Sequence, residues 1–207
     1  MAENFTLASL LGSGGPTLII LLLCSIISWI IIIERWLYFG RRRVQLDSLL
    51  AAALTDQGPG AAEQESIEGY VLTECLTAGQ PGSDSWERDF EEIKGRAIAE
   101  KLPEMERYLN VEATLGTVSP YIGLLGTVFG IIQAFGHLGS QADTSGSMTG
   151  LNQGIAQALV ATAGGLLVAI PATMAFNYFR KKVSQAVLRS EVAASRLKMA
   201  LLKKAGL

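Results

Sequence analysis

The chain is poor in the residues that most enzymes and metal sites use. His137 is the only histidine among 207 residues, and the two cysteines, Cys24 and Cys75, stand far apart in unlike surroundings. One histidine cannot build a histidine-based triad or a multi-histidine metal site within one subunit. The cysteine spacing predicts neither a zinc site nor a disulfide. We therefore expect no enzymatic activity, no cofactor and no metal.

Charge is also scarce. Only 17% of the residues are charged, whereas 49% are hydrophobic and gathered in long blocks, and the formal net charge is -2. This composition is typical of a membrane protein rather than a soluble globular one. No concentrated basic face stands apart from the membrane-flanking clusters, so the sequence predicts no nucleic-acid partner.

Three apolar segments, 16–33, 115–138 and 155–179, contain no Asp, Glu, Lys or Arg. Eighteen residues of helix span ~27 Å at ~1.5 Å per residue, close to the ~30 Å hydrocarbon core of a bilayer. The first segment has its positive charges after it and no cleavage site, so we expect it to remain as a membrane helix. Pro120 and Pro171 are tolerated in such helices. The sequence predicts an all-α membrane protein with three transmembrane helices.

The basic residues indicate the orientation of these helices. All 17 Lys and Arg lie in segments 34–114 and 180–207, and none lies in the N-terminal tail 1–15 or in the loop 139–154. The positive-inside rule then places the N-terminus outside the cell and the C-terminus in the cytoplasm. Segments 34–114 and 180–207 are therefore predicted to be long cytoplasmic extensions, the second of them one helix.

The cytoplasmic insert 34–114 reads as three amphipathic helices separated by two turn-rich breaks, "DQGPG" and "AGQPGSD". Ser85 is a candidate N-cap, and the helix after it is expected to continue through Pro103 into the second span with a bend. The insert carries a net charge of -7 and the tail 180–207 one of +7. These charges indicate either membrane-flanking and solvated faces or an electrostatic pairing of tail and insert, within or between subunits.

Small residues recur at helical spacing in the second and third spans. They include Gly123, Gly126 and Gly130 in the former, and Ala158, Ala161 and Gly165 in the latter. Helices in lipid associate by close approach at such residues. The first span is rich in Ile and Leu and is expected to face lipid. Because three helices cannot both bury these faces and enclose anything, we expect a homo-oligomer with spans two and three inside, the small residues lining its interfaces.

Three polar residues stand out within these spans. Thr127 and Thr162 lie near the middle of spans two and three, where a lone threonine most often bonds its own helix backbone. Gln157 is costly in hydrocarbon and is expected to face a partner or a cavity. Because spans two and three have no titratable acid or base, a proton relay through them needs a carboxylate from another chain.

Two motifs resemble a known family. "SPYIGLLGTVFGI" followed by "GIAQALVATAGGLLVAIPATMAFN" is similar to the MotA/TolQ/ExbB proton channel family, especially its ExbB and TolQ branch, since MotA-type subunits have four spans. The resemblance implies a multi-pass protein of the bacterial inner membrane, N-terminus periplasmic. It implies a pentameric ring around the single helices of two ExbD/TolR-like partners, each with an essential aspartate. Proton flow down the proton-motive force would then turn the ring and do work on the periplasmic side.

The resemblance also assigns residues. Thr127 and Thr162 match the pore-facing threonines of the family. Its packing positions are matched by Pro120, Gly123, Gly126, Gly130 and Pro171. Many members have glutamate where this chain has Gln157, so this residue is either a pore-mouth or packing residue, which we favour, or a sign of a different proton path.

A second hypothesis is a passive oligomeric membrane scaffold without ion transport. Proton-dependent function that is lost on neutralising a partner aspartate distinguishes the two. Within the first hypothesis, the powered process is nutrient import, envelope maintenance or surface motility, depending on the partner.

Overall fold

The computed structural model describes residues 15–41, 46–54, 66–79, 81–83, 85–140 and 144–206. Within these ranges every regular element is an α-helix. The helices are α2 (Gly15–Arg41), α3 (Leu46–Ala53), α5 (Ile67–Leu76), α6 (Trp86–Met105), α7 (Leu109–Ser140) and α8 (Thr144–Lys204). Two segments named in the sequence analysis lie outside the described residues. They are the predicted tail 1–15, of which only Gly15 is described, and the break "DQGPG".

Three of these helices are long and apolar enough to cross a membrane, which agrees with an all-α membrane protein. The candidate spans are Pro16–Arg41, Leu109–Gly136 and Gly150–Lys204. Their helices are longer than the predicted segments. In particular, α8 joins the predicted third span and the C-terminal helix without a break, and most of the segment predicted as loop 139–154 is helical. Once a helix is nucleated, each added residue gains a hydrogen bond, so polar residues at its end are readily included.

The chain forms two compact units. The first unit comprises Met1–Glu34 and Tyr108–Asn177, and the second comprises Arg35–Arg107 and Tyr178–Leu207. The helices α2 and α8 each contribute one part to either unit. The two units are described separately below.

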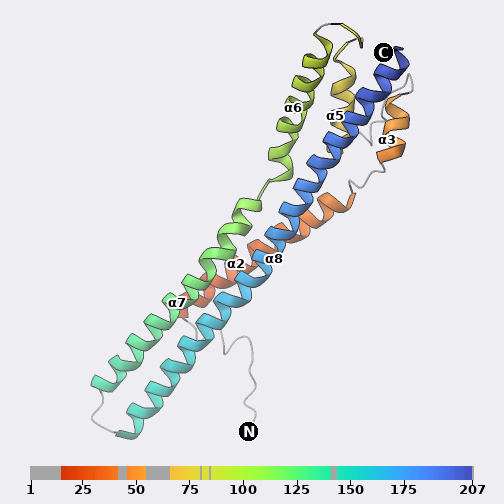
Figure 1. The fold of residues 1–207 in the computed structure, drawn as a ribbon. Helices are drawn as coiled ribbons and strands as arrows, with labels where there is room; N and C mark the ends of the chain where they lie inside the picture. The colour runs from red at the N-terminus through yellow and green to blue at the C-terminus, as the bar shows by residue number, and fades with distance from the viewer. Residues whose placement is uncertain are drawn as a thin grey trace. The chain divides into compact units, whose positions relative to one another are not determined.

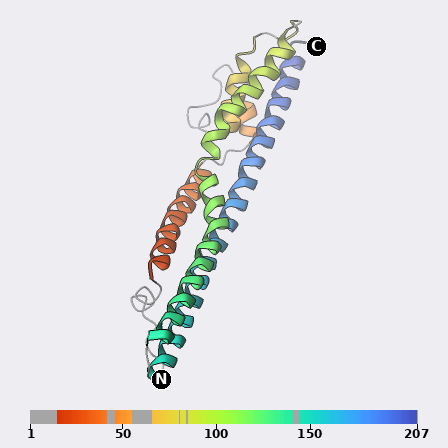
Figure 2. The same cartoon turned by 90° about the vertical axis from the view of Figure 1, so that its left-hand side faces the viewer.

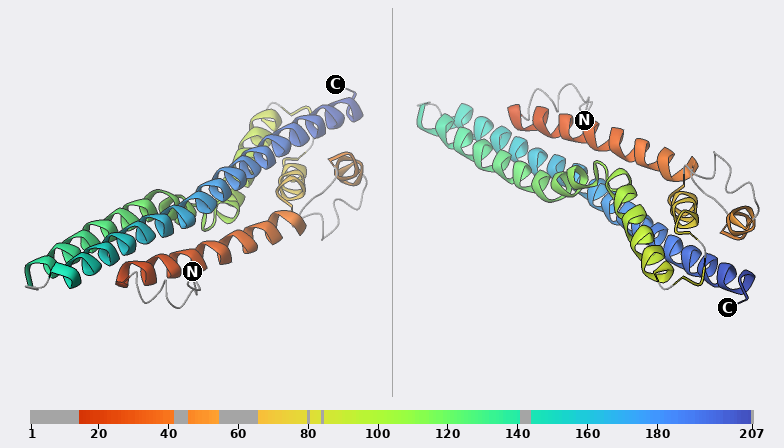
Figure 3. Two further views of the ribbon diagram at one scale, coloured as in Figure 1. Left: turned by 90° about the horizontal axis from the view of Figure 1, so that it is seen from below. Right: turned by 90° about the horizontal axis from the view of Figure 1, so that it is seen from above.

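In the first unit, α7 and the N-terminal part of α8 lie side by side and antiparallel (Figures 1 and 3). The helix α2 contacts this pair through Thr17, which meets Gly126 of α7, and through Leu18 and Leu21, which meet Gly164 of α8. Most of its other apolar side chains are exposed, among them Ile30 and Leu23. That exposed Ile and Leu surface is what a lipid-facing helix requires.

The second unit gathers α3, α5 and α6 around the C-terminal part of α8 (Figures 1 and 2). These three helices lie one in each of the three stretches of the insert that the sequence predicts to be helical. Trp86 and Phe90 of α6 are buried with ring centroids 5.4 Å apart, and Phe39 stacks on Phe179 at 5.8 Å. The Ser66 Oγ accepts a hydrogen bond from the Gly69 N–H at 3.0 Å and so caps α5.

The connection between α6 and α7 differs from the prediction. The sequence suggests one bent helix through Pro103, but α6 ends at Met105 and α7 begins at Leu109. Tyr108 has a φ of 63°, in the left-handed region that interrupts a right-handed helix. Ser85 occupies the predicted N-cap position of α6, yet its side chain makes no capping bond because its ψ of -22° is already helical.

Ion pairs join the tail helix to the insert within the second unit. Lys198 of α8 lies 3.9 Å from Glu87 and 3.8 Å from Glu91 of α6, and Arg196 lies 3.5 Å from Asp47 of α3. The alternative of an electrostatic pairing inside one chain is therefore confirmed for these residues. The pairs are largely exposed, so each contributes little to stability, on the order of 0–1 kcal/mol.

Candidate functional site

The contact between α7 and α8 is a contact between backbones. A Cβ atom placed on Gly123 would lie 2.9 Å from the carbonyl oxygen of Ala161, and one placed on Gly165 would lie 2.7 Å from that of Ser119. Distances this short leave no room for any side chain at either glycine. The small residues of both spans therefore serve to bring the two main chains together, as is usual for helices in lipid.

The remaining predicted packing residues continue this contact. Gly130 approaches the Cβ of Ala158 at 2.9 Å and Gly126 that of Ala161 at 2.5 Å, both measured from an added Cβ. Pro120 and Pro171 lie inside α7 and α8, which run through them without interruption. All these approaches occur within one chain. Contacts between subunits at the same small residues stay a prediction from the sequence.

The two threonines differ in what their hydroxyls bind. The Thr127 Oγ1 donates to the carbonyl oxygen of Leu124 in its own helix at 2.6 Å. The Thr162 Oγ1 donates across the contact to the carbonyl oxygen of Gly123 at 3.4 Å. Both side chains are half-buried. Thr127 therefore shows the common back-bonding of membrane threonines, whereas Thr162 connects α8 to α7.

A groove runs beside the contact, with a volume of about 460 Å³. Thr127 is its polar residue. The other lining residues are Ile131, Ala134, Phe135, Leu151, Ile155, Ala158 and Leu159. Gln157 is half-buried but is not among them, and neither is Thr162. The structure thus places one of the three predicted polar residues on this groove.

Sequence reasoning missed a buried acid in the first unit. Glu112 of α7 is fully buried, and its Oε2 accepts a hydrogen bond from the Ser28 Oγ of α2 at 3.0 Å. Glu112 falls in the predicted cytoplasmic insert 34–114 because the predicted second span, which contains no charged residue, begins at Leu115. The spacing of residues 112, 116, 119, 123, 126 and 130 carries the signal. It alternates steps of four and three and so places Glu112 on the same face as the glycines.

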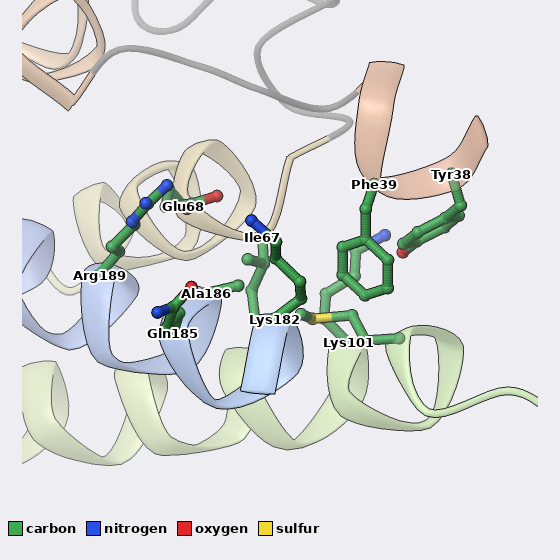
Figure 4. A pocket seen from close by; sticks show the side chains of 10 residues that line it. Tyr38, Phe39, Ile67, Glu68, Lys101, Lys182, Gln185, Ala186 and Arg189 are labelled. Atoms are coloured by element: carbon green, nitrogen blue, oxygen red, sulfur yellow. The ribbon is translucent and has the colours of Figure 1, made fainter. Parts of the chain in front are cut away.

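The second unit holds a pocket of about 380 Å³ with charged and aromatic walls (Figure 4). Its lining residues are Tyr38, Phe39, Ile67, Glu68, Lys101, Met105, Lys182, Gln185, Ala186 and Arg189. The ammonium groups of Lys101 and Lys182 lie over the rings of Tyr70 and Tyr178, at 4.8 Å and 5.4 Å. Sequence reasoning missed this pocket because α2, α5, α6 and α8 each supply only two to four of its residues.

Burial sets the ionisation of two groups in the second unit. Desolvation raises the pKa of Glu68, against the opposing effect of the Arg189 guanidinium, which Figure 4 shows reaching towards it. Burial also raises the pKa of the Cys75 thiol to about 12, so that this cysteine is an inert thiol at neutral pH. Among the described residues, no group of three or more His, Cys, Asp or Glu side chains is placed to hold a metal ion.

Comparison with known proteins gives a consistent result. A family model described as "MotA/TolQ/ExbB proton channel family" matches residues 63–192. The chain is 30% identical to the biopolymer transport protein ExbB of Salmonella typhimurium over 177 residues, 79% of this chain and 71% of that protein. It is 33% identical to the Tol-Pal system protein TolQ of Haemophilus influenzae over 191 residues, 81% and 79% of the two chains. A putative ExbB-like protein of Synechocystis is 29% identical over 178 residues, 81% and 82% of the two chains.

Proposed function

Because the chain belongs to the MotA/TolQ/ExbB proton channel family, we propose that it is the ExbB/TolQ-like stator subunit of a motor driven by the proton-motive force. The observation that carries this proposal is the family match over residues 63–192, since that range includes the whole α7–α8 contact and both threonines. In the proposed arrangement the protein lies in the bacterial inner membrane, with its N-terminus in the periplasm. It transmits energy to the periplasm or the outer membrane.

The proton path in this proposal passes between this chain and a partner. Segments 115–138 and 155–179 contain no Asp, Glu, Lys or Arg, so they offer hydroxyls but no charge to a proton at membrane depth. An ExbD/TolR-like partner with one membrane helix and an aspartate supplies the missing carboxyl. Thr127 lines the groove beside the contact, where a partner helix would pack against its side chain. Gln157 then belongs to the mouth of the path or to packing.

The ring in this proposal is a homopentamer. The small residues of α7 and α8 are already used within the chain, so the subunits contact one another through larger side chains. Exposed apolar residues on the two helices are available for this, including Tyr121, Phe135, Leu159, Leu167 and Met174. The rest of this surface faces lipid.

The test is a reconstitution of the protein with the partner encoded beside its gene. We expect a particle with five copies of this chain by native mass spectrometry in lipid, and proton flux in liposomes that is lost when the partner aspartate is changed to asparagine. Another copy number would refute the ring. Flux that is absent, or indifferent to the aspartate, would favour a passive scaffold.

A further inference from the structure

Glu112 is a buried acid with only half of its carboxyl group partnered. Its exposure is 0%, and its Oε2 accepts the 3.0 Å hydrogen bond from Ser28. The Oε1 is also buried and has no hydrogen-bond partner among the described residues. Both Glu112 and Ser28 lie within helices that are long and apolar enough to cross a membrane. An ionisable side chain in such a place is costly and marks a functional site more often than a structural one.

The Ser28 hydroxyl suits both protonation states of this carboxyl. When Glu112 is ionised, Ser28 donates to Oε2, as the distance shows. When Glu112 is protonated at Oε1, Oε2 becomes the carbonyl oxygen of the acid and goes on accepting the hydrogen bond from Ser28. The change needs no rotation of the serine and no repacking. A group that only fastened two helices would not need this adaptability.

Within the described part of the chain, no cation offsets the charge of Glu112. Among the described residues its one hydrogen bond is that from Ser28, and no Lys or Arg forms an ion pair with it. Burying a carboxylate without a counter-ion is unfavourable. We therefore expect the proton-motive force that acts on the complex to drive both the loss and the return of the Glu112 proton.

The geometry points to Glu112, positioned by Ser28, as a second proton-binding group, contributed by this chain itself. In each passage Oε1 takes a proton from water, forming an O–H bond, and later returns the same proton to water, so that no other species is consumed. Glu112 precedes Thr127 by fifteen residues, ~22 Å at ~1.5 Å per residue of helix. The two residues therefore act at different depths. This inference rests on the proposed function and extends its path to the end of α7 where the helix begins.

The experiment uses the full complex with its partner in liposomes and compares three single variants. Glu112→Gln keeps the size and the acceptor for Ser28 but cannot titrate, Ser28→Ala removes the positioning hydroxyl, and Glu106→Gln is the control at an exposed acid nearby. We expect Glu112→Gln to assemble and to lose proton flux by about tenfold or more. Ser28→Ala should lose less, and Glu106→Gln none.

Normal flux in an assembled Glu112→Gln complex would overturn the inference and leave a structural tie. Absence of flux in the unmodified complex would instead refute the proposed function, so the two failures are distinguishable. If Glu112→Gln does not assemble, the unmodified complex is treated with dicyclohexylcarbodiimide, which reacts with protonated buried carboxyls. We expect an adduct on Glu112 whose rate changes when a proton-motive force is imposed. No adduct, or an unchanged rate, would overturn the inference.

Discussion

At the scale of single residues, both threonine hydroxyls already donate a hydrogen bond, but their oxygens can still accept one. Thr127 donates to Leu124 and Thr162 to Gly123, and each oxygen can still accept a further hydrogen bond. A protonated partner carboxyl or a water molecule supplies the donor for such a bond. Back-bonding of Thr127 is therefore compatible with a place on the proton path, because it leaves the oxygen free to accept a hydrogen bond.

This reasoning predicts the effect of removing each hydroxyl. Thr127→Val and Thr162→Val change volume little, so the complex should assemble while proton-coupled activity falls by about tenfold or more. The measurement is energised uptake or growth, with a native gel as the check on assembly. The matched control is Thr117→Val on α7, whose hydroxyl also bonds its own helix. If both valine variants stayed active, the hydroxyls would be helix-backbone bonders only.

The glycines of the α7–α8 contact could be predicted from a local sequence pattern, whereas the buried Glu112 could not. Small residues at helical spacing predicted a close contact because lipid leaves few other ways to associate helices, and Gly123 and Gly165 form one. Glu112 was missed because a search for segments without charged residues begins after the last charged residue, and that residue is Glu112 itself. Its partner Ser28 is 84 positions away in the sequence, and no local pattern gives such a pairing.

At the scale of elements, the α7–α8 contact predicts a sharp difference between two glycines of the same helix. An added Cβ at Gly123 meets backbone atoms of α8, whereas one at Gly136 meets nothing within 4 Å. Gly123→Ala should therefore destabilise the chain by about 1–3 kcal/mol, and Gly136→Ala should be neutral or slightly stabilising. Thermal unfolding in detergent measures both. Equal midpoints would mean that the two helices are not in backbone contact.

The second unit offers a prediction about pH. The pKa of Glu68 is raised from 4.5 by burial, so the folded state binds this proton more tightly than the unfolded state. The stability that Glu68 contributes is then full below pH ~4.5 and falls as the pH rises through its folded pKa. The thermal midpoint of the unmodified chain should decline over this range relative to Glu68→Gln. Parallel curves would show that Arg189 cancels the cost of burial, and Glu106→Gln serves as the exposed control.

Helix boundaries were the least predictable part of the elements. The break between α6 and α7 depends on the left-handed conformation of Tyr108, and no proline or glycine stands at that position to indicate it. The uninterrupted α8 crosses a Gly- and Ser-rich start and a cluster of basic residues, both of which commonly mark helix ends. Each of the three stretches of the insert that the sequence predicts to be helical contains one of the helices α3, α5 and α6.

At the scale of the whole molecule, the distribution of titratable groups assigns tasks to different chains. Glu112 stands at the beginning of α7, and the uncharged segments 115–138 and 155–179 offer no further Asp, Glu, Lys or Arg. A proton crossing ~30 Å of hydrocarbon cannot be carried by hydroxyls alone, because they do not ionise at accessible pH. The family to which the chain belongs is described as a proton channel, and the path proposed above takes its further carboxyl from a partner.

The protein without its partner is therefore expected not to conduct protons. Vesicles that hold this chain alone, loaded with a pH-sensitive dye and given a membrane potential, should acidify no faster than empty ones. Adding the partner should start the flux, and adding a partner whose aspartate is changed to asparagine should not. The helices of partner-free protein still pack through Gly123 and Gly165, so a folded and assembled sample can be verified before the measurement. Rapid flux from that sample would mean that Glu112, water and the threonines complete a path by themselves, and the partner would then be a gate rather than a proton carrier.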